Sequence, residues 1–132
     1  MKNIELAIEK SMLPIEVSTA KEMVARYQAT RKTLIDETHG INDTRSIWFD
    51  IEGLKNFINN LPENASGVRV HLAAYDQGNK HAPNQTTVIF TGTIEKGYGH
   101  VDVLDKDDSL WTIEDDVMGP FNAGRTCPPL CG

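Results

Sequence analysis

Ser46-Ile-Trp-Phe-Asp-Ile-Glu-Gly-Leu-Lys-Asn-Phe-Ile-Asn-Asn-Leu61 has the pattern of a strand that runs directly into a helix. The three residues after Ser46 are strand formers, and Asp50 follows where its carboxylate can accept from the free N–H groups of a first helical turn. Apolar residues then recur at the spacing of one helical face: Ile51, Leu54, Phe57, Ile58 and Leu61. The stretch predicts a short buried strand over 46–49 and an amphipathic helix over 51–61, which Pro62 ends.

Two more helices are predicted before this stretch. Residues 3–12 place apolar side chains on one face, and Pro14 follows them. Thr19-Ala-Lys-Glu22 has the form of a capping box. In this motif the threonine hydroxyl accepts from the Glu22 N–H, and the glutamate side chain accepts from the Thr19 N–H. The second helix is therefore expected over 19–36, with its apolar stripe against a sheet.

Three strands are predicted after it, over 67–75, 86–95 and 100–104. The first alternates between apolar and polar side chains, and a glycine-rich turn separates the last two. With 46–49 as a fourth member, these strands give an antiparallel sheet. Since the helices come first and most strands later, the predicted fold class is α+β, with an antiparallel sheet of about four strands, three helices packed on one face and an irregular C-terminal tail.

The chain has 132 residues, which predicts a single domain over 1–132 with an N-terminal helical arm at 1–17 and an irregular tail at 105–132. Its net charge of −6 arises from 102–116, where seven acidic residues accompany one lysine. Nucleic acid is not an expected partner, because no basic patch is present to neutralise phosphates. No apolar run of about eighteen residues and no signal peptide is visible, so we expect no membrane partner and a cytoplasmic location.

Polar side chains on one face of the predicted sheet form a candidate ligand-binding or catalytic site. Arg69, His71 and Tyr75 share a face of one strand, and His100 and Asp102 join them if the hairpin register allows. Such a set offers a base, an orienting carboxylate and a cation. The alternative is the solvated face of a one-layer sheet. The chain carries no nucleophile elbow and no glycine-rich phosphate loop, so the sequence favours a protein that is not an enzyme.

Cys127-Pro-Pro-Leu-Cys131 is open to three interpretations. The two thiolates could bind zinc together with His100 or His71, although a second Cys or His pair is lacking. They could instead form a disulfide or react with other thiols. In the third interpretation, two reduced cysteines pack as small apolar side chains and hold the tail in a groove. We predict the third, because cytosolic thiols stay reduced.

An acidic segment partly matches a calcium-binding loop. Oxygen ligands stand at loop positions 1, 3, 5 and 12, in Asp105, Asp107, Ser109 and Asp116. The loop glycine is replaced by Leu110, and the last position lacks the bidentate glutamate. A solvated acidic turn is therefore the favoured interpretation, and no cofactor is predicted beyond the zinc and calcium alternatives.

Three segments together resemble a group of small, uncharacterised bacterial proteins: the strand–helix stretch at 47–58, Gly67-Val-Arg-Val-His-Leu-Ala-Ala-Tyr75, and the terminal Cys-Pro-Pro-Leu-Cys. The resemblance implies no activity. It implies that the cysteine-containing tail and the strand–helix–strand segment are parts of one structural unit.

From these patterns we expect a non-enzymatic binding or assembly module that binds itself or another protein, as a homo-oligomer. A small sheet with helices on one side leaves edge strands available, and the tail carries Trp111, Phe121 and Leu130 for docking on a neighbour. The alternatives are a small-molecule enzyme or ligand-binding protein that uses the polar sheet face, and a metal-binding protein that uses the two cysteines.

Overall fold

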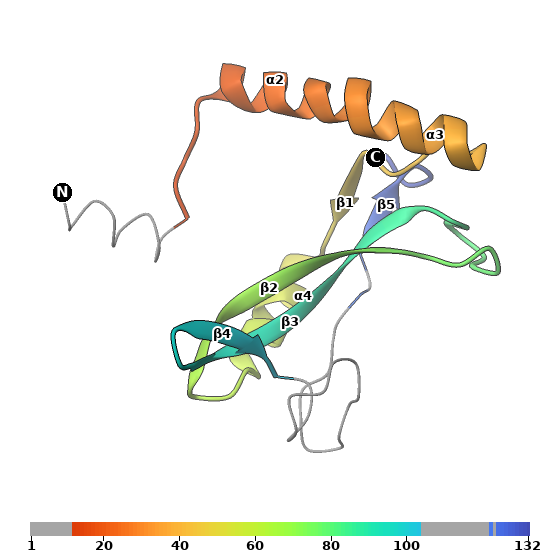
Figure 1. The fold of residues 1–132 in the computed structure, drawn as a ribbon. Helices are drawn as coiled ribbons and strands as arrows, with labels where there is room; N and C mark the ends of the chain where they lie inside the picture. Colours follow the sequence, from red (N-terminus) through yellow and green to blue (C-terminus); the bar gives the residue numbers. More distant parts are fainter. Residues whose placement is uncertain (1–11, 104–121, 123) are drawn as a thin grey trace.

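The structure is a computed structural model that describes residues 12–103, 122 and 124–132. Its elements follow in the order α2 (Val17–Tyr27), η1 (Gln28–Lys32), α3 (Thr33–His39), β1 (Ser46–Trp48), α4 (Ile51–Asn59), β2 (Ala65–Ala74), β3 (Thr86–Lys96), β4 (Gly99–Asp102) and β5 (Arg125–Cys127) (Figure 1). Helices and antiparallel strands coexist, which confirms the α+β class. The helix predicted over 3–12 lies outside the described residues, apart from its last position.

The predicted strand–helix unit is present as β1 and α4. The Asp50 carboxylate accepts from the Gly53 N–H at 3.0 Å, so the predicted N-cap is formed. Helix α4 lies against one face of the sheet (Figure 1). There the rings of Phe49 and Phe57 approach Phe90 of β3, with centroids 4.8 Å and 5.9 Å apart. This aromatic cluster is the apolar core beneath the helix.

Strands β2, β3 and β4 form an antiparallel sheet in that order. Arg69 pairs with Thr91, Val70 with Phe90, and Thr93 with Asp102. Because side chains alternate along a strand, one face carries the threonines, the arginine and the aspartate, while α4 covers part of the apolar face. Strand β2 is an edge strand among the described strands of this sheet.

The prediction that 46–49 adds a fourth strand to this sheet is wrong. Strand β1 pairs with β5, with Ser46 opposite Cys127, in a separate two-stranded ribbon. Gly124 permits the close approach, since a Cβ at this position would lie 2.6 Å from Cζ of Phe49. The end of the tail is therefore regular at 125–127, whereas the sequence predicted an irregular tail throughout 105–132.

The prediction that the second helix packs its apolar stripe on the sheet is also wrong. The helix is continuous through α2, η1 and α3, and Met23, Val24 and Leu34 are each more than half exposed. The capping box is not used, because the helix begins at Val17, two residues before Thr19, with no side-chain cap. The helix contacts the rest of the protein through a polar side that includes Lys32, its one buried residue. Among the described helices, α4 alone covers a sheet face (Figure 1).

Candidate functional site

The polar face of the sheet gathers two of the predicted site residues around a third, Asp102. This residue ends β4, and its side chain is only 4% exposed. Its Oδ1 accepts from Nη1 of Arg69 at 2.7 Å, and its Oδ2 lies 2.8 Å from Nε2 of His71. The hairpin register thus brings Arg69, His71 and Asp102 together, as the alternation of the strands indicated. Both carboxylate oxygens are occupied, so Asp102 can orient the two basic side chains.

The other two predicted residues of this face are placed differently. His100 takes part through its carbonyl oxygen, which accepts from Nη2 of Arg69 at 3.0 Å, while its ring Nδ1 lies 2.7 Å from the Ser66 hydroxyl. Tyr75 lies four residues beyond His71, about 13 Å along an extended chain, and its hydroxyl donates to Oδ1 of Asn122 at 2.6 Å. The five residues therefore do not converge on one point.

A hollow of about 800 Å³ lies beside the start of β2. Residues from all three strands line it: Ser66, Gly67, Val68, Arg69, Val70, Thr93, Glu95 and His100. His71, Tyr75 and Asp102 do not line this hollow, so it does not coincide with the site that the sequence predicted. It nevertheless offers a guanidinium, an imidazole and a carboxylate to a small polar ligand.

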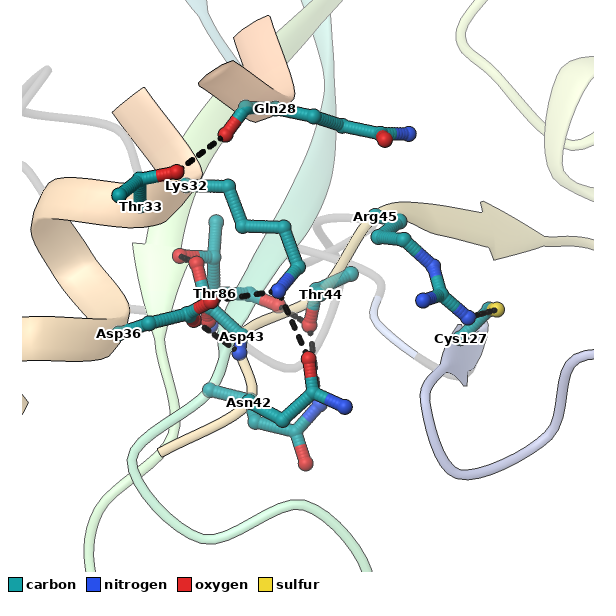
Figure 2. A network of polar contacts seen from close by, with 11 residues as sticks. Gln28, Lys32, Thr33, Asp36, Asn42, Asp43, Thr44, Arg45, Thr86 and Cys127 are labelled. Carbon is teal, nitrogen blue, oxygen red and sulfur yellow. Dashed lines mark hydrogen bonds and ion pairs between the residues drawn. The ribbon is translucent and has the colours of Figure 1, made fainter. Parts of the chain in front are cut away.

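A second polar cluster was not predicted from the sequence (Figure 2). Nζ of Lys32 donates to Oδ2 of Asp36 at 2.6 Å and to Oδ1 of Asn42 at 2.7 Å. Asp43 is fully buried, and its carboxylate accepts from the N–H and the hydroxyl of Thr86, both at 2.7 Å. The cluster joins the long helix to the start of β3. The four-residue spacing of Lys32 and Asp36 was the one sequence signal for this cluster. Nothing in the sequence links Asp43 to a strand more than forty residues later.

Asp36 of this cluster and Tyr27, which feels the charges of Asp43 and Asp36, have perturbed pKa values. Hydrogen bonds, first from the Lys32 ammonium and then from the Asp43 N–H, lower the pKa of Asp36 below its usual value. Burial, together with the negative charges of Asp43 and Asp36, raises the pKa of Tyr27. The cluster thus favours a charged Asp36 and a neutral phenol.

The prediction of two reduced, packed cysteines is wrong in this structure, because Cys127 and Cys131 form a disulfide. The physical reason is the tight return of the chain, in which the Leu130 N–H donates to the Thr126 carbonyl and the two cysteine Cα atoms come within 4.6 Å. Nη2 of Arg45 lies 3.3 Å from Sγ of Cys127 and 3.2 Å from Sγ of Cys131. No sequence signal placed an arginine there.

The zinc alternative is not assembled among the residues that the structure describes, and the structure does not test the calcium alternative. Joined cysteines offer no thiolate to zinc, and the described ranges contain no group of three or more metal-ligating side chains. The calcium candidates Asp105, Asp107, Ser109 and Asp116 lie outside the described residues, as do Trp111 and Phe121 of the tail.

Within the described part of the chain, no helix is both long and apolar enough to cross a membrane. Comparison of the chain with protein-family models, with curated proteins and with solved structures finds no match in any of the three.

Proposed function

We propose that this protein is a self-associating binding module in which two copies join through strand β2. The observation that carries the proposal is the exposure of the apolar side chains of this strand, which is 41% for Val68, 50% for Val70 and 84% for Leu72. They stand on an edge strand whose outer backbone groups have no partner strand among the described residues. An edge of this kind favours pairing with another strand.

The occupant that fits this edge is a second copy of the same strand. Two β2 strands related by a two-fold axis through Val70 run antiparallel and place Val68 of one copy opposite Leu72 of the other. An axis perpendicular to the sheet keeps the apolar faces of both copies on the same side. Each α4 then covers the same face of a continuous six-stranded sheet, and the exposed valines gain apolar neighbours across the interface.

The end of the tail is not the docking element in this proposal. Residues 125–127 already pair with β1 of their own chain, so β5 has a partner strand without a second copy. The prediction that the tail docks on a neighbouring copy therefore rests on Leu130, which is exposed, and on residues outside the described ranges.

The test compares two valines with similar exposure on different surfaces. Val70→Lys places a charge at the two-fold axis, where it would face its own copy, and we expect a monomer in sedimentation equilibrium. Val24→Lys introduces the same charge on α2, where 54% of the valine is exposed, and should remain a dimer. A wild-type protein that is strictly monomeric at micromolar concentration would refute the proposal. Dissociation caused by Val24→Lys alone would equally refute the assignment to β2.

The hollow beside β2 favours a second candidate function, the binding of a small ligand. The observation in its favour is that Arg69 and His100 line the hollow with Glu95 as its one acidic side chain, so the basic side chains outnumber the acidic one, which suits a small carboxylic acid. Calorimetric titration with acetate and succinate should show saturable binding that His100→Ala abolishes, whereas Tyr98→Ala, at a fully exposed side chain, should leave binding intact. Absence of saturable binding to the wild type would exclude this function for these acids.

A further inference from the structure

We propose that the bond between Cys127 and Cys131 is a reactive disulfide that exchanges with an external thiol, and that Arg45 stabilises the thiolate released. This inference is independent of the proposed self-association, because it concerns the β1–β5 ribbon and not β2. It rests on three features of the bond: the loop that it closes, its access to solvent and its cationic neighbour.

The loop closed by the bond is very short. The cysteines are separated by only four positions, and a loop of this length restricts the unfolded chain much less than a long one. The segment is also held without the sulfur bond. The Arg45 N–H donates to the Cys127 carbonyl at 2.5 Å, and Nε2 of Gln85 donates to the Pro128 carbonyl at 2.7 Å. The bond is therefore not needed to bring this segment to β1.

The two sulfurs differ in their access to solvent. Cys131 is exposed and lines a hollow of about 470 Å³, together with Trp48, Arg125, Pro129, Leu130 and Gly132. Cys127 is half-buried and does not line this hollow. An entering thiolate therefore reaches Sγ of Cys131 first, which makes Sγ of Cys127 the leaving group.

The guanidinium of Arg45 lies beside both sulfurs, so the direction of attack rests on solvent access and not on this cation. Its Nη2 is 3.3 Å from Sγ of Cys127 and 3.2 Å from Sγ of Cys131, and its backbone is fixed by the hydrogen bond to the Cys127 carbonyl. A cation beside a sulfur lowers the free energy of the thiolate and makes it a better leaving group. The side chain of Arg45 is exposed, so solvent screens this effect and its size is that of a surface ion pair.

The exchange balances as a two-electron transfer from a dithiol. A thiolate of the external dithiol forms a bond with Sγ of Cys131, while the bond between the two cysteines breaks and Cys127 leaves as a thiolate beside Arg45. The second thiolate of the dithiol then attacks its own sulfur in the mixed disulfide and releases Cys131. The dithiol is oxidised to its disulfide, the two cysteines are reduced, and the released thiolates take up protons according to pH.

The first experiment identifies the sulfur that is attacked. The full-length folded protein is treated briefly with reduced glutathione, quenched with N-ethylmaleimide and analysed by tandem mass spectrometry. We expect glutathione on Cys131 and the maleimide on Cys127. Glutathione mainly on Cys127 would overturn the proposed direction of exchange. Recovery of two free thiols per chain from protein kept with excess oxidised glutathione would overturn the proposal altogether.

The second experiment measures the contribution of Arg45. The equilibrium of the cysteine pair with reduced and oxidised dithiothreitol is compared for wild type, Arg45→Gln, Arg45→Lys and the remote control Arg26→Gln. Loss of the charge should lower the equilibrium constant for reduction, and the rate of reduction, each by about two- to fivefold. This is the size of effect expected of a solvent-exposed ion pair. Arg45→Lys should retain part of the effect, and Arg26→Gln should match wild type. If wild type and Arg45→Gln have equal equilibrium constants for reduction, and circular dichroism shows that both are folded, the role of Arg45 is refuted.

Discussion

Removal of the Asp43 carboxylate should destabilise the protein more than any surface substitution. This side chain is completely buried and accepts two hydrogen bonds of 2.7 Å from Thr86, one from the N–H and one from the hydroxyl. Hydrogen bonds to a charged group contribute about 1.5–3 kcal/mol each, and Asp43→Ala leaves both donors without their acceptor. We therefore expect the free energy of unfolding to fall by about 3–6 kcal/mol, a large part of the stability of a domain of this size.

A double-mutant cycle isolates the hydroxyl bond from the rest. Thr86→Val removes this bond and keeps the backbone bond, so the coupling between Asp43→Ala and Thr86→Val should be about 1.5 kcal/mol or more. Urea unfolding followed by circular dichroism gives each free energy, and Glu63→Ala, at an exposed acidic residue, should change stability by less than about 0.5 kcal/mol. A loss below about 1 kcal/mol for Asp43→Ala, or a coupling near zero, would refute the view that this contact holds the helix to β3.

Three further predictions concern other contacts. Asp102→Ala should lower the free energy of unfolding by about 2–4 kcal/mol in thermal or urea unfolding, at the lower end of the range for a broken buried ion pair because 42% of its partner Arg69 is exposed. Gly124→Ala should cost about 1–3 kcal/mol from overpacking, whereas Gly99→Ala, whose added Cβ meets no atom within 4 Å, should cost less than 1 kcal/mol. The lowered pKa of Asp36 predicts that its charge stabilises the fold above the usual carboxyl pKa of 3.8 and that this contribution disappears as pH falls through the lowered folded-state pKa. Wild type should therefore be more stable than Asp36→Asn at neutral pH, and urea unfolding at a series of lower pH values should show this difference shrinking; a difference that does not depend on pH would contradict the assignment.

The elements that the sequence predicted well are those with a strong local pattern. Helix α4 has both an apolar stripe and an N-cap, and the hairpin of β3 and β4 has a glycine-rich turn. Alternation along β2 was sufficient to place Arg69 and His71 on one face, and the hairpin register then brought Asp102 to them. These inferences succeeded because each depended on a contact between neighbouring strands or within one turn of helix.

The errors in strand pairing and helix packing concern partners that are distant in the sequence. A short strand such as β1 carries no information about which strand it pairs with, and its partner β5 lies in a segment rich in proline and glycine. The apolar stripe of the long helix predicted burial, yet the helix is fixed by Lys32, Asp36 and Asp43, whose charged side chains are typical of exposed positions. The disulfide was rejected on the expected cellular location, which is not a property of the local geometry.

The distribution of burial gives a physical reason for self-association. Among the described residues, the buried apolar side chains are those of Phe57 and Ala82, while nine polar or charged residues are buried. A domain of this size normally buries a larger apolar core, and apolar burial is the main favourable term in folding. The apolar sides of β2 and of the long helix are therefore apolar surface that remains exposed in the described part of the chain. Burial of the β2 face at an interface between two copies would cover part of this surface, so we expect the unfolding temperature of wild type, but not of Val70→Lys, to rise with protein concentration.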